Sequence, residues 1–188
     1  MKIIDTTLPG VILIEPRCFG DDRGFFLETY SAQRYSDAGI TEPFVQDNHS
    51  RSQRGVLRGL HYQLNYPQGK LVSVTRGEVL DIAVDIRVGS PTFGKAYSVL
   101  LNDKNHYQLY IPPKFAHGFV VLSDTVDFVY KCTDYYHPED EKGLLWSDPV
   151  LGIDWQIDNP QLSEKDKNNK SLEELKAANE LPLYRDES

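Results

Sequence analysis

Apolar and polar residues alternate along several short segments of this chain. In the clearest of these, residues 80–87, Leu80 and every second residue up to Ile86 are aliphatic, and the residues between them are mostly polar. A period of two residues predicts a half-buried β-strand. Other short segments rich in aliphatic or aromatic residues are expected to form strands as well. They occupy residues 11–14, 24–30, 70–76, 97–101, 106–111, 118–122 and 126–133.

Turn-forming residues separate these segments. Gly, Pro, Asn, Asp and Ser occur at residues 77–78, 89–91, 102–103 and 123–124, where tight connections are expected. Many short strands joined by turns favour a sandwich or barrel over alternating strands and helices. The pattern therefore predicts a mainly β fold of the jelly-roll type.

Helical patterns occur only at the margins of the predicted strands. Residues 31–38 are expected to form a short helix that ends at Gly39, and Ser163 and Ser171 are each followed three residues later by an acidic residue, as in a capping box. We predict a single domain over residues 1–188, with a jelly-roll core over 1–162 and a helical C-terminal tail over 163–188.

Composition and charge narrow the class of protein. A chain of 188 residues, 40% apolar and 26% charged, can bury a core without disulfides. The formal net charge of −8 argues against general nucleic-acid binding. Cys18 and Cys132 show no metal or redox spacing, and the sequence contains neither a signal-peptide pattern nor an apolar segment of transmembrane length. We expect a cytoplasmic protein that does not contact membranes.

Basic residues are concentrated in one part of this acidic chain. Residues 48–77 contain no Asp or Glu, although the whole chain has 28 such residues among 188. Arg side chains in such a segment can bind phosphate oxygens. Alternatively, they form a solvated face that is paired with acids elsewhere. The five basic residues are Arg51, Arg54, Arg58, Lys70 and Arg76.

His61 lies within this basic segment. If residues 56–63 form a strand, Arg58 and Lys70 come within reach of one pocket with His61. An imidazole can accept and return a proton near neutral pH. A single histidine on a strand, however, is more often structural than catalytic.

Three other side chains are candidates for chemistry. Tyr130 could donate a proton, or it could pack in the core with its hydroxyl hydrogen-bonded. His117 follows two prolines in a turn and could bind a metal, contact phosphate or pack. Asp166 could orient an imidazole, although an acid at the start of a helix also suits the helix dipole.

A metal site is not expected. Jelly rolls of the cupin kind often bind a metal through a His-X-His pair, a nearby Glu and a later His. The corresponding segment here, His61-Tyr62-Gln63, has no second His and no nearby acid, and only His117 fits the later position. Two of the four usual ligands are missing, so we predict a site without metal or cofactor.

Six motifs occur in order at residues 23–28, 46–50, 55–63, 69–72, 112–119 and 148–149. They are Arg-Gly-Phe-Phe-Leu-Glu, Gln-Asp-Asn-His-Ser, Gly-Val-Leu-Arg-Gly-Leu-His-Tyr-Gln, Gly-Lys-Leu-Val, Pro-Pro-Lys-Phe-Ala-His-Gly-Phe and Asp-Pro. In order and spacing they resemble the dTDP-4-dehydrorhamnose 3,5-epimerase family. The resemblance extends from about Val11 to Asp166, and the block around His61 is its most specific part.

This resemblance implies a fold, a reaction and an assembly. The expected fold is a cupin-type double-stranded β-helix jelly roll with short peripheral and C-terminal helices. The expected enzyme is a homodimeric epimerase without a metal cofactor. Its substrate would be dTDP-4-dehydro-6-deoxyglucose, a dTDP-4-keto-6-deoxy sugar nucleotide, and its product dTDP-4-dehydrorhamnose.

The resemblance also assigns roles to individual residues. His61 would be the base, Asp166 its orienting partner, Tyr130 the acid on the opposite face of the sugar and Lys70 the cation that stabilises the enolate. The substrate-binding positions would be Gln46, Asn48, Arg58 and His117 for diphosphate and sugar, Tyr136 for stacking on thymine, Arg23, Phe26 and Glu28 reached across the dimer, and Glu141 and Lys165.

Other functions remain open at this point. Relatives with this fold invert only C3 or only C5 of related dTDP-4-keto-6-deoxysugars, and the sequence separates them poorly from a double epimerase. A ketoisomerase fits the motifs around His61 and Lys70 less well. A metal-dependent cupin and a nucleotide-sugar binding module without catalysis are the alternatives from other classes.

Overall fold

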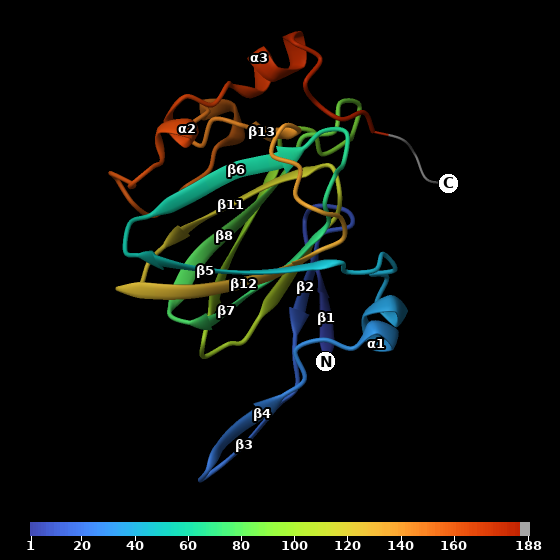
Figure 1. Ribbon diagram of the computed structural model, residues 1–188, viewed down its shortest axis with the longest axis vertical. Coiled ribbons are helices and arrows are strands. Elements are labelled where there is room, and N and C mark those ends of the chain that lie inside the picture. The colour runs from blue at the N-terminus through green and yellow to red at the C-terminus, as the bar shows by residue number, and fades with distance from the viewer. Residues whose placement is uncertain (185–188) are drawn as a thin grey trace.

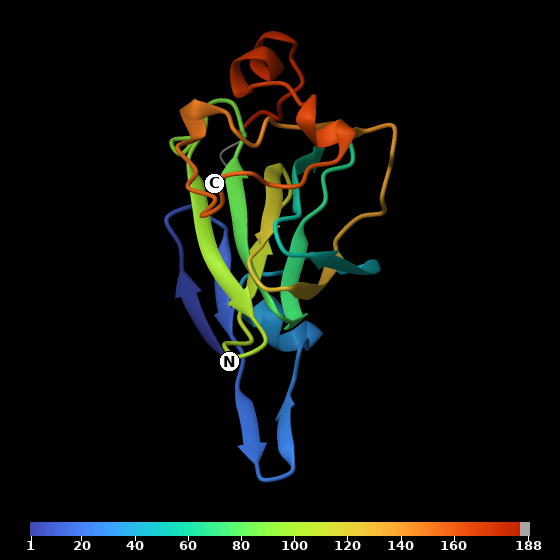
Figure 2. The ribbon, with the colours of Figure 1, turned by 90° about the vertical axis from the view of Figure 1, so that its left-hand side faces the viewer.

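The computed structural model describes residues 1–184 and contains two antiparallel sheets packed face to face (Figures 1 and 2). One sheet has six strands in the spatial order β1 (Lys2–Asp5), β2 (Ile12–Glu15), β10 (Gln108–Ile111), β7 (Lys70–Arg76), β12 (Thr125–Cys132) and β5 (Gln46–Gln53). The other has five strands in the order β13 (Glu141–Gly143), β6 (Leu57–Gln63), β11 (Phe115–Val121), β8 (Glu78–Asp85) and β9 (Ala96–Asn102). The mainly β architecture predicted from the alternating pattern is confirmed.

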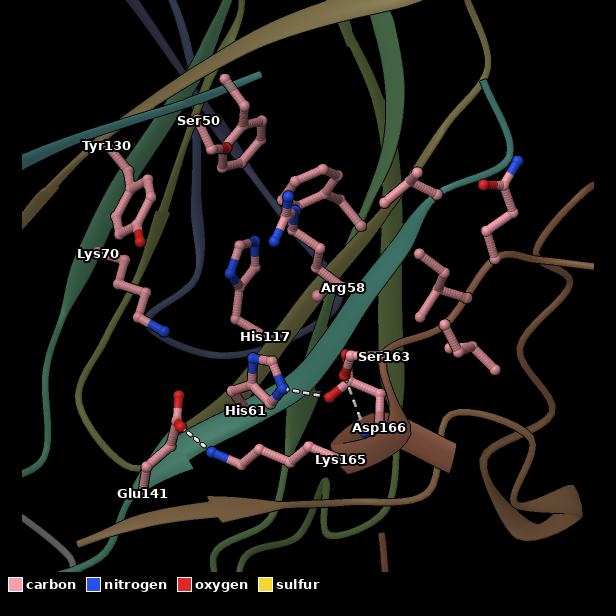
Figure 3. Close-up of a pocket in the computed structure, with 17 residues that line it drawn as sticks. Ser50, Arg58, His61, Lys70, His117, Tyr130, Glu141, Ser163, Lys165 and Asp166 are labelled. Carbon is pink, nitrogen blue, oxygen red and sulfur yellow. Dashed lines mark hydrogen bonds and ion pairs between the residues drawn. The ribbon is translucent and has the colours of Figure 1, made fainter. Parts of the chain in front are cut away.

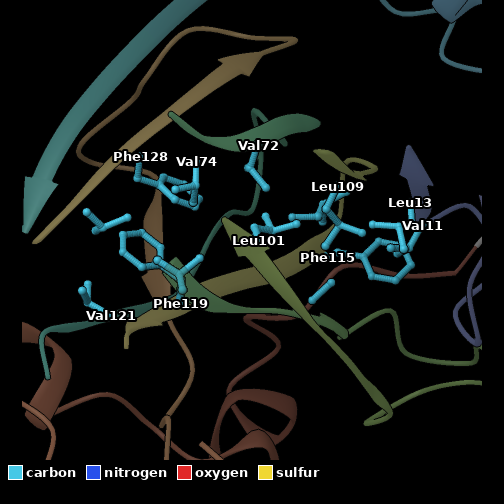
Figure 4. Close-up of a cluster of buried hydrophobic side chains, with 14 of the residues drawn as sticks. Val11, Leu13, Val72, Val74, Leu101, Leu109, Phe115, Phe119, Val121 and Phe128 are labelled. Carbon is cyan, nitrogen blue, oxygen red and sulfur yellow. The ribbon is translucent and has the colours of Figure 1, made fainter. Parts of the chain in front are cut away.

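The space between the sheets is filled by aliphatic and aromatic side chains (Figure 4). Val72 and Val74 of β7 point into this core, as do Val126 and Phe128 of β12, because alternate residues of a strand face the same side. Tyr130, two residues after Phe128, lies at the margin of the cluster. The same alternation therefore directs side chains of β12 into the core and places the Tyr130 phenol at the edge of the apolar cluster.

The strand at residues 80–87 differs from its prediction. In β8 only Glu78 is partly exposed, so the strand is buried on both faces and not half-buried. Val79 and Ala83 face the core between the sheets. Leu80 and Ile82 face outward, into a second apolar cluster. The aliphatic stripe is thus covered from outside the sandwich.

The C-terminal segment provides this cover. It contains a short 3-10 helix (Pro149–Leu151) and the helices α2 (Glu164–Lys167) and α3 (Leu172–Ala177), which lie over the outer face of the five-stranded sheet (Figure 1). Leu172 and Leu175 are buried there. The capping box predicted at Ser171 is confirmed. At Ser163 the side chain accepts a hydrogen bond from the backbone of Asp166, but the Asp166 carboxylate contacts His61 instead of completing the box.

A two-stranded hairpin formed by β3 (Cys18–Asp21) and β4 (Gly24–Leu27) projects away from both sheets (Figures 1 and 2). Phe25 and Phe26 on it are 64% and 69% exposed. The predicted helix near residue 31 is confirmed as α1 (Ala32–Asp37), which packs Tyr35 against the six-stranded sheet. No helix within residues 1–184 has the length and apolar character needed to cross a membrane.

Candidate active site

A cavity of about 520 Å³ lies between the two sheets (Figure 3). A second hollow of about 300 Å³ adjoins it, and both are lined by His61, Lys70, Tyr130 and Glu141. Arg58, His117, Lys165 and Asp166 line the first hollow only; Gln46, Asn48, Gln68, Cys132 and Tyr136 line the second only. Eleven of the fourteen site residues expected from the sequence therefore meet in this region.

An irregularity in β6 brings Arg58 and His61 to the same cavity. The two residues are three positions apart, so a regular strand would direct them to opposite faces. The register with β11 shifts between His117 and Phe119, and Gly59 has φ +119°, a conformation that glycine adopts without strain. A Cβ atom on Gly118 would lie 2.6 Å from the carbonyl oxygen of Arg58, so the two strands can approach this closely only with glycine there.

His61 and Asp166 form a hydrogen-bonded pair. The Nε2 atom of His61 lies 2.6 Å from Oδ1 of Asp166, and the Asp166 side chain is 4% exposed. Burial alone would raise the pKa of Asp166, but the hydrogen bond and positive charge of His61 hold that pKa below its usual value. In Figure 3 the other ring nitrogen of His61 points into the cavity. This arrangement suits a general base whose charged form is stabilised by a fixed carboxylate.

Tyr130 and Lys70 enter the cavity from the opposite sheet. Tyr130 belongs to β12 and Lys70 to β7, whereas His61 belongs to β6 of the five-stranded sheet. Burial raises the pKa of the Tyr130 phenol, so this group holds its proton at neutral pH. Burial lowers the pKa of the Lys70 ammonium, against the opposing effect of Cys132, Glu141 and Asp81. A base and an acid thus flank one space, with a cation beside it.

A second histidine–aspartate pair lies beside the same cavity, which is lined by its histidine. Nε2 of His117 is 2.9 Å and 3.1 Å from the two carboxylate oxygens of Asp81, which is fully buried. Sequence reasoning did not select Asp81, because an acid in an alternating strand was assigned to the solvent side. The sequence did contain one indication that Asp81 is buried: in a strand it shares a face with the apolar Val79 and Ala83.

Some basic residues of the segment 48–77 line the cavity, as an anion site requires, and others pair with acidic residues outside it. Arg58 and Lys70 line the cavity. Arg51 instead makes two hydrogen bonds of 2.8 Å to Asp127 on the neighbouring strand. Arg54 is paired with Asp124 at 3.1 Å, outside the cavity. Only part of the segment is thus available to an anionic ligand in this cavity.

Polar side chains are linked to one another around the second hollow. Gln46 donates to Asn48 at 3.0 Å and accepts from the backbone of Tyr136 at 3.1 Å. The Tyr136 hydroxyl donates to Glu141 at 3.2 Å, and Glu141 forms an ion pair with Lys165. Burial would raise the pKa of Glu141, but the Lys165 hydrogen bond and the charge of His61 keep it below its usual value. The Tyr136 ring is half-exposed and can stack on a planar ligand.

Two further residues of the second hollow gave no signal in the sequence. Gln68 donates to the carbonyl of Asp134, and Cys132 is buried and accepts a hydrogen bond from Asn48 at 3.5 Å. Across residues 1–184, no three His, Cys, Asp or Glu side chains are grouped in a way that could hold a metal ion.

Three expected substrate-binding residues lie outside the cavity of their own chain. Arg23 and Phe26 are on the projecting hairpin, and Glu28 follows it. The Arg23 side chain is 90% exposed and pairs with Asp21, whereas Glu28 pairs with Arg34 at 3.1 Å. Their expected action across a dimer stays a prediction.

Comparisons with known proteins identify the family of this chain. The model of the dTDP-4-dehydrorhamnose 3,5-epimerase family matches residues 5–174. The epimerase of this name from Pseudomonas aeruginosa is 56% identical over 174 residues, which cover 92% of this chain and 96% of the relative. That from Escherichia coli is 51% identical over 178 residues, covering 93% and 96%.

Solved structures share the fold. A crystal structure of dTDP-6-deoxy-D-glucose-3,5-epimerase from Legionella pneumophila in complex with dTDP-4-keto-L-rhamnose superposes with a TM-score of 0.94 at 56% identity, covering 98% of both chains. A 3'-monoepimerase from Streptomyces bikiniensis in complex with dTDP-quinovose gives 0.90 at 33% identity, covering 95% of this chain and 92% of the other. The predicted jelly-roll architecture is confirmed, and the chain belongs to the dTDP-4-dehydrorhamnose 3,5-epimerase family of carbohydrate epimerases.

Proposed function

We propose that this protein inverts C3 and C5 of dTDP-4-dehydro-6-deoxy-D-glucose to give dTDP-4-dehydro-L-rhamnose. The observation that carries the proposal is the opposition of His61 and Tyr130, which approach one cavity from different sheets. Inversion requires that a proton leave one face of the sugar and that another arrive on the opposite face. The Legionella relative holds the corresponding product, dTDP-4-keto-L-rhamnose.

The C4 ketone makes the protons on C3 and C5 acidic. His61 removes one of them through the ring nitrogen that faces the cavity, while Asp166 stabilises the resulting imidazolium. The electron pair moves to the C4 oxygen, and the Lys70 ammonium stabilises this developing charge. Tyr130 then protonates the carbon from the other face, and exchange with solvent restores both side chains.

The remaining polar residues hold the nucleotide. Arg58 supplies positive charge, and Arg58 and His117 supply hydrogen-bond donors, for the diphosphate and sugar. The half-exposed Tyr136 ring provides a stacking surface for thymine. Gln46 and Asn48 add amide groups beside it, and Glu141 and Lys165 line the same opening. Proton transfer between carbon and these side chains requires no metal or cofactor.

We expect the enzyme to be a cytoplasmic homodimer. The hairpin carries Arg23 and Phe26 far from the cavity of its own chain and exposes two phenylalanines. A second copy that receives this hairpin would cover the apolar rings and bring Arg23, Phe26 and Glu28 to the partner's nucleotide.

The test is NMR of dTDP-4-dehydro-6-deoxyglucose incubated with the protein in deuterium oxide, with the product trapped by a reductase. We expect deuterium at both C3 and C5 and the rhamno configuration in the trapped product. Deuterium at one carbon only would instead identify a monofunctional epimerase such as the Streptomyces relative. Binding without exchange at either carbon would contradict catalysis and leave a nucleotide-sugar binding module.

A further inference from the structure

Asp81 and His117 form a pair that differs from His61 and Asp166 although the chemical groups are the same. Both oxygens of Asp81 lie within 3.1 Å of Nε2 of His117, and the carboxylate is fully buried. His117 is 8% exposed and lines the cavity beside Arg58. The second pair thus lies deeper in the protein than the first, whose histidine side chain is 25% exposed.

The surroundings of the two carboxylates determine the charge of each histidine. Burial raises the pKa of Asp166, and His61, Ser163 and the Gly59 backbone together hold it below its usual value, so the negative charge of Asp166 does not depend on His61 alone. His61 can therefore be neutral, as a base must be. Among residues 1–184, Asp81 has no side-chain partner other than His117. A fully buried carboxylate is costly unless its charge is compensated. The Lys70 ammonium is near enough to interact with the charge of Asp81, but His117 is the side chain hydrogen-bonded to it, which favours the positively charged form of His117.

We propose that Asp81 is a positioning residue that holds His117 as an imidazolium and aims its second N–H at the diphosphate of the substrate. With Nε2 engaged by Asp81, Nδ1 carries the remaining proton and is free to donate. An imidazolium and a guanidinium side by side suit two negatively charged phosphoryl groups. The inference rests on the proposed nucleotide-sugar function and assigns different tasks to the two pairs: His61–Asp166 moves protons, and His117–Asp81 binds anions.

The first experiment compares Asp81→Asn with the matched variant Asp166→Asn. We expect Asp81→Asn to weaken dTDP binding, measured by calorimetry, by roughly tenfold to a hundredfold, the usual effect of losing a charge-assisted hydrogen bond. KM should rise by more than kcat falls. Asp166→Asn should show the reverse, with kcat strongly reduced and dTDP affinity retained. Unchanged dTDP affinity in Asp81→Asn would overturn the proposal.

The second experiment keeps the proposal testable if Asp81→Asn does not fold. Nitrogen-15 NMR of wild-type protein, with the His117 signal assigned by means of His117→Gln, reports the charge of the ring directly. We expect both ring nitrogens to be protonated at neutral pH with dTDP bound, and a neutral ring in Asp81→Asn. A neutral His117 in the wild type would refute the imidazolium, and a merely structural Asp81 would lower the melting temperature without changing the ring charge.

The pH dependence of dTDP binding alone does not isolate His117, because other side chains of the cavity also titrate or carry charge. Asp81 on β8 contacts His117 directly. The other titratable and charged side chains that line the cavity with His117 are Arg58 and His61 on β6, Lys70 on β7, Tyr130 on β12, Glu141 on β13, and Lys165 and Asp166 on α2. The ring measurement separates His117 from these groups. Neither dTDP binding nor the ring charge requires turnover, so a wild-type protein that fails to convert the sugar nucleotide would contradict the proposed reaction without deciding the role of Asp81.

Discussion

At the scale of single residues, the different exposure of His61 and Asp166 matters most. The His61 side chain is 25% exposed, and Asp166, at 4%, is fixed behind it. His61→Ala removes the base without touching Arg58 or Tyr136, so we expect turnover to fall by a factor on the order of 100 to 10,000 and dTDP affinity to be nearly unchanged. A coupled assay and calorimetry measure the two quantities. Substantial residual turnover would exclude His61 as the base.

A suitable control for this variant is His49→Ala. His49 lies on β5, is 58% exposed and contacts Asp127 at 3.1 Å, and it does not line the cavity. Turnover should stay near the wild-type value. A similar loss in both variants would indicate general damage instead of a missing base.

Tyr130 is expected to act after the proton has been removed. Burial raises the pKa of its phenol, which keeps the acid protonated until the enolate has formed. Tyr130→Phe should therefore slow inversion more than it slows deuterium exchange, because abstraction by His61 persists. NMR in deuterium oxide follows both processes in one sample. Equal losses of exchange and inversion would contradict a separate acid.

At the scale of strands, the sequence allows a strand over residues 56–63, where β6 lies, but does not show how its side chains are directed. Regular alternation would separate Arg58 from His61, and only the shift in register beside Gly59 brings them together. Such a shift in register depends on contacts between strands that are distant in sequence, so no local sequence pattern predicts it. Asp81 escaped prediction for a related reason: β8 is buried on both faces, and alternation alone cannot show that the polar side is covered too.

The close approach of β6 and β11 gives a prediction of its own. A methyl group at Gly118 would meet the carbonyl oxygen of Arg58 at 2.6 Å, so Gly118→Ala should force the strands apart. We expect a loss of about 1–3 kcal/mol in the free energy of unfolding, as for overpacking, together with reduced turnover. Urea denaturation measures the loss. In the control Gly20→Ala the new methyl group would meet its nearest neighbour at 3.7 Å, and stability should change little.

The stability that the Arg51–Asp127 ion pair adds between β5 and β12 should depend on pH. The hydrogen bonds and charge of Arg51, with a further contribution from His49, lower the pKa of the Asp127 carboxyl from its ordinary value of 3.8 to about 2. Because the folded pKa lies below the unfolded one, the stabilisation is present above pH 4 and is lost as the pH falls from about 4 to about 2. The difference in stability between wild type and Asp127→Asn should therefore shrink over this range in urea titrations. A constant difference would contradict the pairing.

At the scale of the whole molecule, composition and alternation were sufficient for the class of fold but not for its layers. The aliphatic stripe from Leu80 to Val84 faces outward, away from the core between the sheets. It is buried because the C-terminal segment covers the outer face of β8. The sequence places Leu172 and Leu175 three residues apart, a spacing that puts them on one face of a helix. It could not show which sheet receives this face, since that depends on contacts across about 90 residues.

The hairpin is the other feature that only the whole molecule can explain. Arg23 is 90% exposed and lies outside the cavity of its own chain, although the resemblance implies that it contacts the nucleotide. In a homodimer that exchanges hairpins, each active site would combine His61 of one chain with Arg23 of the other. Sedimentation analysis should then show a dimer, and both His61→Ala and Arg23→Ala should reduce turnover.

Mixing these two variants distinguishes exchange between chains from action within a chain. If the hairpin acts across the dimer, a mixed dimer contains one site with intact His61 from the Arg23→Ala chain and intact Arg23 from the His61→Ala chain. Activity should then reappear on mixing and approach half that of wild type per mixed dimer. If each hairpin served its own chain, every site in the mixture would lack one of the two residues, and no activity would return.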